Sequence, residues 1–228
     1  MQRAPSGPQA CPPASPLCGE PCDAEQHARD DATIPFPRSS NDDRAAIHLS
    51  KAMREIFVRG RSKLVEGLWF LVEWAVVNNS LMPVSAVRLF ALRLFGARIG
   101  TDCRCPHAIR VKFPWKLTIG DRCWLGDGAW LYNQAHLTIG SDVCISRQAF
   151  ITTESHGGKK AMDLQADPIV IEDGVWITPG CILQKGVTVA RNTLVTPGSV
   201  LHRSTRPDSV YGGSPAEYLR PRFDSFEP

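Results

Sequence analysis

Two histidines and an asparagine lie near the middle of the chain at positions where they could act on a hydroxyl group. His156 stands in TESH; Asn133 and His136 stand in YNQAH, with His136 twenty residues before His156. A neutral imidazole can take the proton of an alcohol whose oxygen attacks a carbonyl, because its ordinary pKa lies near neutrality. An amide both donates and accepts hydrogen bonds, which suits a polyol. These residue types predict His156 as a general base and Asn133 as an acceptor-binding residue.

Each of these residues also has a structural interpretation. A lone loop histidine is most often solvated, and Asn133 could bridge turns of the chain. His136 precedes a bulge of only two residues, so we expect it to be structural or at most to line the cleft. His107 and His48 have no partner that the sequence identifies. His156 stands out because it opens the one long interruption of a regular repeat.

The repeat has a period of six residues over 98–204. An aliphatic residue, or once a cysteine, marks each unit, and a small or β-branched residue usually follows four positions later. The marks are Ile99, Cys105, Val111, Ile119, Leu125, Leu131, Ile139, Ile145, Ile151, Ile171, Ile177, Leu183, Val189, Val195 and Leu201. Neither a helix nor a hairpin strand has this period. It predicts a mainly β fold, a parallel β-helix with three short strands per coil and the marks stacked inside.

Departures from the period locate the candidate site. Coils begin at Ile99, Ile119 and Ile139, each twenty residues after the last instead of eighteen, and the next coil, at Ile171, begins thirty-two residues after Ile139. The extra residues fall at about 153–168. A loop ejected from a regular solenoid is a common place for function, so we expect the active site there.

The eight cysteines do not predict a metal site or a disulfide framework. Cys103, Cys123 and Cys181 occupy the small inward positions of the repeat, where they would fill a narrow core. Cys11, Cys18 and Cys22 lie in a proline-rich tail at 1–45, where zinc binding is the alternative to a disordered tail.

Two helical stretches connect this tail to the repeat. Residues 46–97 contain SKLVEGLWFLVEWAVVNNS and AVRLFALRLFGA, with apolar residues three to four apart and more basic than acidic residues. We expect this amphipathic preface to cap the β domain and help hold subunits together, with peripheral membrane contact as the alternative. Residues 205–228 form a C-terminal extension.

Composition narrows the class of protein further. A net charge of +3 with no long basic run does not indicate nucleic-acid binding. No secretory signal is evident, and the apolar window 68–77 is too short to span a membrane. We expect a cytoplasmic protein, with contact at the inner face of the membrane left open.

The sequence resembles a known family over 86–223. The segments that carry the resemblance are RLFGARIG, IRVKFPWKLTIGD, WLYNQAHLTIGSDVCIS, TESH, PIVIEDGVWI, VTPGSVL and GGSPAEYL. They are similar to the left-handed β-helix, hexapeptide-repeat acetyltransferases, and among these to the colanic acid biosynthesis acetyltransferase group.

The resemblance implies transfer of acetyl from acetyl-CoA to a sugar hydroxyl, in exopolysaccharide biosynthesis, by a homotrimer without a metal. It also implies His156 as the base, Asn133 at the acceptor, and a cofactor groove between neighbouring subunits. The matching positions for acetyl-CoA are Pro179, Pro197, His202, Arg203 and Arg220. The two arginines could meet CoA phosphates.

Departures from the family pattern leave other functions open. Gly157 follows His156 where relatives carry an acidic residue, and Thr178 and Pro179 replace small residues. An inactive scaffold of a polysaccharide assembly complex is one alternative; an amine or serine acceptor is another. The γ-type carbonic anhydrases share this prism, but their metal site needs histidines at a close spacing that is absent from this sequence.

Overall fold

The computed structural model describes residues 60–156 and 164–223. The proposed tail at 1–45, with its three cysteines, and the start of the helical preface lie outside the described residues. Part of the predicted active-site loop, 157–163, and the last residues, 224–228, also lie outside them.

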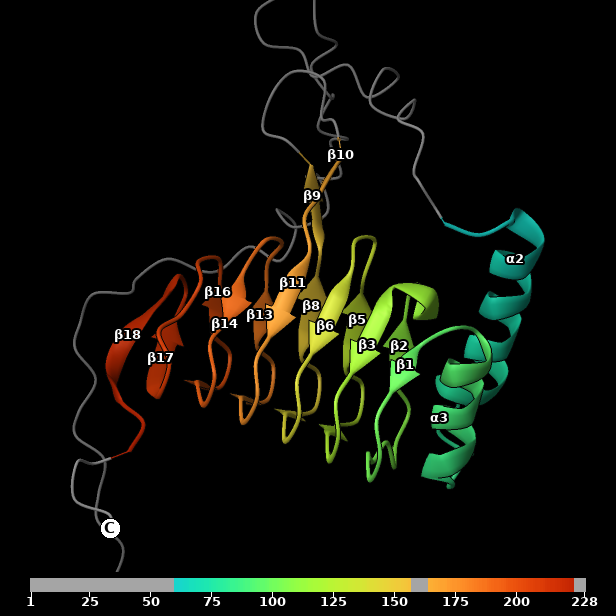
Figure 1. Ribbon diagram of the computed structural model, residues 1–228, viewed down its shortest axis with the longest axis horizontal. Helices are drawn as coiled ribbons and strands as arrows, with labels where there is room; N and C mark the ends of the chain where they lie inside the picture. Colours follow the sequence, from blue (N-terminus) through green and yellow to red (C-terminus); the bar gives the residue numbers. More distant parts are fainter. Residues whose placement is uncertain (1–59, 157–163, 224–228) are drawn as a thin grey trace, which may run out of the picture. The chain divides into compact units, whose positions relative to one another are not determined.

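Short strands coil into a parallel β-solenoid with three sides (Figure 1). The first side holds β1 (Arg98–Ile99), β3 (Leu117–Ile119), β6 (Leu137–Ile139), β11 (Ile169–Ile171) and β14 (Thr188–Val189). The second side holds β4 (Trp124–Leu125), β7 (Cys144–Ile145), β12 (Trp176–Ile177), β15 (Leu194–Val195), β17 (Ser209–Gly213) and β18 (Ala216–Pro221). The third side holds β2 (Arg110–Val111), β5 (Trp130–Tyr132), β8 (Phe150–Thr152), β13 (Ile182–Leu183) and β16 (Val200–Leu201).

The aliphatic marks of the repeat form the core. Ile119, Ile139, Ile171 and Val189 stack in register along the first side. Each is at most 3% exposed. The mainly β, parallel β-helix of hexapeptide repeats that the sequence predicted is therefore confirmed, together with the helices that precede it.

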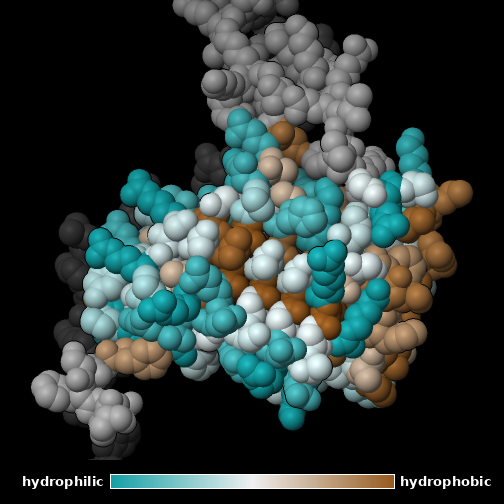
Figure 2. All heavy atoms as spheres, viewed as in Figure 1, coloured by the Kyte–Doolittle hydropathy of each residue, from teal (hydrophilic) through white to brown (hydrophobic). Residues whose placement is uncertain are grey.

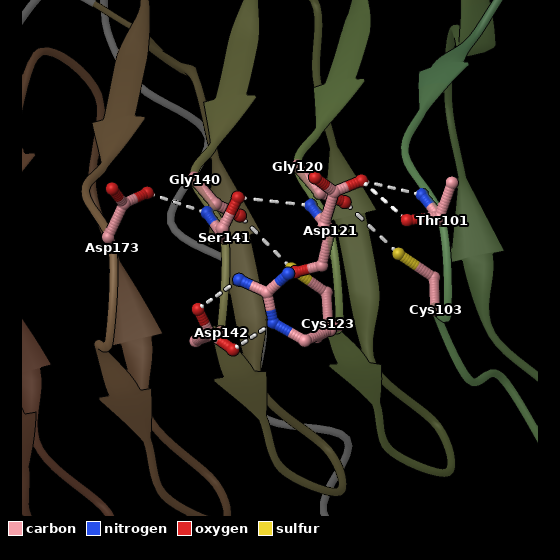
Figure 3. A network of polar contacts seen from close by, with 10 residues as sticks. Thr101, Cys103, Gly120, Asp121, Cys123, Gly140, Ser141, Asp142 and Asp173 are labelled. Atoms are coloured by element: carbon pink, nitrogen blue, oxygen red, sulfur yellow. Dashed lines mark hydrogen bonds and ion pairs between the residues drawn. The ribbon is translucent and has the colours of Figure 1, made fainter.

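A ladder of side-chain hydrogen bonds ties successive coils at the corner between the first and second sides (Figure 3). Asp121 Oδ1 accepts from the Thr101 backbone nitrogen at 2.6 Å, and the Ser141 backbone nitrogen donates to Asp173 Oδ1 at 2.6 Å. Beside the ladder, the Cys103 and Cys123 thiols each donate to the backbone carbonyl of a glycine in the next coil. Cys123 and Cys181 are buried and Cys103 is partly buried, so these cysteines fill the core as predicted.

Glycine is required where the coils approach most closely. A Cβ built on Gly120 would lie 2.6 Å from the backbone carbon of Gly140 and 2.6 Å from Ser141 Oγ, well inside van der Waals contact. This explains the isoleucine–glycine pairs that recur at the same point of the first three coils.

Helices close the N-terminal end of the solenoid (Figure 1). They are α2 (Lys63–Val72), which continues into the π-helix η1 (Glu73–Val77), and α3 (Ser85–Leu94). Ser62 caps α2 by accepting from the Val65 backbone nitrogen. The predicted capping role is thus seen for the described part of the preface. Within the described residues, no helix has the length and apolar character needed to cross a membrane.

Arg88 fastens this cap to the first coil. Its side chain is fully buried, and its guanidinium donates to the backbone carbonyls of Val77, Asn79, Cys105 and Pro106 at 2.8–3.3 Å. At the other end of the solenoid, the C-terminal extension forms the antiparallel pair β17–β18.

Candidate active site

The corner between the third and first sides carries the predicted loop, and it begins as a hairpin. β9 (Glu154–His156) pairs with β10 (Leu164–Ala166) in antiparallel register, and His156 lies opposite Leu164. The hairpin projects away from the solenoid (Figure 1). The same corner carries the two-residue bulges of the first two coils, through η2 (Pro114–Lys116) and residues 133–136. His156 is exposed and lies at the outer end of β9, two residues beyond Glu154 at the base of the hairpin.

Glu154 lies beside His156 and is half-buried. Burial raises the pKa of the Glu154 carboxyl, while its hydrogen bond with Tyr132 and the charge of His156 oppose that rise. The pKa of the Tyr132 hydroxyl is also raised, first by burial and then by the charge of Glu154. The corner therefore places a carboxyl, a phenol and an imidazole within electrostatic reach of one another.

Two buried oxygens in this cluster lack hydrogen-bond donors among the described residues. They are Gln134 Oε1 and Glu154 Oε2. A buried acceptor without a donor costs about 1–3 kcal/mol, so such a pair favours a ligand that supplies donors. Because Glu154 adjoins His156, hydroxyl groups bound by these oxygens would lie next to the imidazole.

The sequence motifs did not single out Gln134, Glu154 or Tyr132, although the coil spacing pairs the first two. Gln134 and Glu154 are twenty residues apart, as are His136 and His156. The coil length that paired the histidines also pairs these two residues at equivalent positions of adjacent coils.

Asn133 is wholly buried and bridges two coils. Its Nδ2 donates to the Phe113 carbonyl at 2.7 Å, and its Oδ1 accepts from the Phe113 backbone nitrogen at 3.0 Å. Of the two roles that the sequence left open, this geometry is the structural one. A direct contact between Asn133 and the acceptor stays a prediction.

His136 lies on the same corner, on the side nearer the helices. With Gly60, Arg61, Trp115 and Lys116 it lines a cavity of about 510 Å³. Lys116 Nζ donates to the Gln134 carbonyl at 2.5 Å. His136 thus lines a cavity on the coil before that of His156, and a contact of His136 with the acceptor stays a prediction.

The residues predicted to hold acetyl-CoA divide between two corners. His202 and Arg203 follow β16 on the corner of the His156 hairpin, and both are exposed. Pro179 and Pro197 lie on the corner between the second and third sides, where the Gly198 backbone nitrogen donates to the Pro179 carbonyl at 3.0 Å. Arg220 is exposed on β18. One subunit therefore does not gather them into a single pocket within the described residues.

No group of three or more histidine, cysteine, aspartate or glutamate side chains in 60–156 and 164–223 is arranged to hold a metal ion. The cysteines in these ranges are free thiols, and burial raises the pKa of Cys123 to about 11. The Cys123 thiol is therefore a poor nucleophile.

Comparison with known proteins assigns the family. The chain is 33% identical over 168 residues to the colanic acid biosynthesis acetyltransferase WcaF of Escherichia coli K12, covering 73% of this chain and 92% of that protein. It is 27% identical to a hexapeptide-repeat acetyltransferase of Vibrio cholerae, solved with acetyl-CoA, with a TM-score of 0.66 and coverage of 77% and 98%. A galactoside acetyltransferase solved with coenzyme A, 17% identical over 71% of this chain and 82% of that one, shares the fold at a TM-score of 0.65. No family model matches the chain.

The chain belongs to the hexapeptide-repeat acetyltransferases, acyltransferases whose donor is acetyl-CoA. The resemblance that the sequence motifs carried is therefore confirmed.

Proposed function

We propose that this protein is an O-acetyltransferase that moves acetyl from acetyl-CoA to a saccharide hydroxyl in exopolysaccharide biosynthesis, with His156 as general base. The carrying observation is the pair of buried acceptors, Gln134 Oε1 and Glu154 Oε2, with an exposed histidine two residues beyond Glu154 on the same hairpin strand. A saccharide presents several hydroxyl donors, so it can satisfy both oxygens while another hydroxyl faces the imidazole. The naming of the Escherichia coli relative for colanic acid biosynthesis supports the pathway class.

The proposed reaction is a direct transfer in one complex. His156 takes the proton of the acceptor hydroxyl as that oxygen attacks the thioester carbonyl. The new C–O bond forms, the C–S bond breaks, and the imidazolium returns its proton to the departing thiolate. Glu154 stabilises the transient imidazolium by its charge. Binding both substrates in one cleft supplies part of the rate enhancement.

A homotrimer completes the site in this proposal. Pro179 and Pro197 stand on a different corner from His202 and Arg203, so a groove that uses both sets needs corners from two subunits. Arg203 and Arg220, both exposed, are suited to meet CoA phosphates. The free cysteines agree with a cytoplasmic location.

The test is acetyl transfer from labelled acetyl-CoA to free and lipid-linked oligosaccharides, with wild type, His156→Ala and His136→Ala compared. We expect label on the saccharide, and a loss of about a hundredfold or more only in His156→Ala. Transfer that survives in His156→Ala but not in His136→Ala would move the base to His136. Absence of both transfer and acetyl-CoA binding would favour the scaffold alternative, and transfer to an amine would overturn the hydroxyl acceptor. A monomer by sedimentation would overturn the shared cleft.

A further inference from the structure

The outer side of the helical cap is an apolar surface open to solvent. Leu81, Trp74 and Phe90 are 90%, 71% and 64% exposed. Figure 2 shows apolar atoms covering the end of the molecule where Figure 1 places α2 and α3. We call this surface the cap face, made of Leu64, Leu68, Leu71, Trp74, Leu81, Val84, Val87, Phe90 and Leu94.

The cap face is a continuous stripe on each helix. Leu64, Leu68 and Leu71 recur at helical spacing along α2, and Val87, Phe90 and Leu94 do so along α3. The opposite face of the same helices is apolar as well, since Trp69 and Leu92 are fully buried against the solenoid. Helices that are apolar on both faces belong in a covered environment.

The cap cannot roll to hide this face, because polar contacts fix its other side to the first coil. Trp69 Nε1 donates to the Val111 carbonyl at 3.0 Å, and Glu73 Oε1 accepts from the Val111 backbone nitrogen at 3.1 Å. The Ile109 backbone nitrogen donates to the Val77 carbonyl at 3.2 Å. Arg88, buried and bonded to carbonyls, also holds α3 in place.

The exposed charges of the segment that forms the cap, residues 60–98, are of one sign. Both acidic residues of the described helices turn inward: Glu66 is buried, and Glu73 is half-buried against the first coil. The exposed charged residues from 60 to 98 are all basic, namely Arg61, Lys63, Arg93 and Arg98. An apolar helical surface with a basic rim and an exposed tryptophan matches the interface of an anionic bilayer.

We propose that the cap face docks on the surface of an anionic lipid bilayer and that the acceptor is a saccharide held in that bilayer by a lipid. The second clause rests on the proposed function; the first does not. The dimensions fit a lipid-held saccharide. β8, which leads into the His156 hairpin, is two strands from β2, the strand against the cap, so about 10 Å separates their coils. The cap helices add a layer about 10 Å thick.

The corner between the cap face and His156 is basic. Its cavity is lined by Arg61, Lys116 and His136 around the Trp115 ring. Such a lining suits the anionic group that joins a saccharide to its lipid, on the path from the bilayer to the imidazole.

Flotation of the full chain with vesicles tests the docking. We expect binding to vesicles of phosphatidylcholine and phosphatidylglycerol, little binding to phosphatidylcholine alone, and weakening by salt. The variant Leu68→Ser/Trp74→Ser/Phe90→Ser should bind roughly tenfold or more weakly. Lys63→Glu/Arg98→Glu should remove the preference for anionic lipid. Leu219→Ser, at 57% exposed and on β18 at the far end, should bind as wild type does.

Several outcomes would overturn the docking. These are no vesicle binding by wild type, equal binding by the triple variant, or a larger assembly in sedimentation that the triple variant dissociates; the last would show that a second copy covers the cap face. Trp74→Phe keeps an apolar group, so it should retain binding while reducing the blue shift of tryptophan emission on vesicles.

Acetyl transfer separates the docking from the proposed function. In the triple variant, transfer to a free oligosaccharide should equal wild type, which also shows that the protein is folded. Transfer to the same oligosaccharide on a lipid in vesicles should fall by roughly tenfold or more. Equal transfer to both acceptors by wild type and variant would overturn the lipid-held acceptor, whereas no transfer by wild type to either would overturn the proposed function alone.

Discussion

Replacing Asn133 distinguishes a structural asparagine from a substrate-binding one. Asn133→Ala removes one donor and one acceptor that the structure pairs with the backbone of Phe113. Asn133 is wholly buried and Phe113 is 2% exposed, so water does not readily replace the lost partners.

The expected cost follows from the two backbone groups left behind. Each unsatisfied buried group costs about 1–3 kcal/mol, so the variant should lose about 2–6 kcal/mol of unfolding free energy. For a chain of this size that corresponds to a melting temperature lower by on the order of 10 °C. The corner beside the His156 hairpin loses one of its ties between coils.

Thermal melting at fixed protein concentration measures the stability of the variant. Steady-state transfer kinetics, recorded well below the melting range, measure its KM for the saccharide. Thr138→Ala, an exposed change in β6, is the matched control and should leave stability unchanged. A melting temperature equal to wild type together with a raised KM for the saccharide would refute the structural role and restore Asn133 to the acceptor site.

Four further changes test the fold and the electrostatics. Arg88→Met should destabilise the protein by about 3–5 kcal/mol in urea unfolding, because it strips buried carbonyls of a charged donor; wild-type stability would contradict that. Gly120→Ala should reduce the yield of folded protein because its Cβ would meet backbone, whereas Gly67→Ala, with nothing within 4 Å, should stabilise α2 by about 0.5–1 kcal/mol. Glu154→Gln should be more stable than wild type at neutral pH. Burial raises the pKa of Glu154 in the folded protein above its ordinary 4.5. Wild type therefore loses stability as the pH rises from 4.5 through the pKa of the folded state. Melting curves from pH 4 to 8 should show the difference vanish at the acid end, and a constant difference would contradict the assignment.

The solenoid was predictable because its restraints are periodic. Each coil must bury the same aliphatic mark and the same small residue, so the six-residue period is written directly in the sequence at positions such as Ile119, Ile139 and Ile171. The insertion was predictable for the same reason, since it breaks the period between Ile139 and Ile171. The environment of the side chains inside the corner was not predictable, because the residues of a bulge do not follow the six-residue repeat.

The directions of the side chains within the bulge distinguish the structural and substrate-binding roles that the sequence left open. Asn133, Gln134 and His136 follow one another closely, yet Asn133 turns inward to Phe113, Gln134 is buried near Glu154, and His136 is exposed. The backbone path through the bulge sets these directions, and residue types alone do not. The same limit applied to the cap, where Trp69 was buried and Trp74 exposed on one apolar stretch.

Hydrogen bonds hold the base of the hairpin that carries His156. Thr153 is wholly buried and joins three segments: its Oγ1 accepts from the Ala135 backbone nitrogen at 2.8 Å, its backbone nitrogen donates to the Tyr132 carbonyl at 3.2 Å, and its carbonyl accepts from the Asp167 backbone nitrogen at 2.9 Å. Asp167 in turn pairs with Lys185 of the next coil at 2.5 Å. Both ends of the insertion are thus held at one residue, and His156 stands only three residues beyond it. If His156 is the base, as proposed, these contacts fix the start of its strand relative to the solenoid, which is what a proton-transfer group requires.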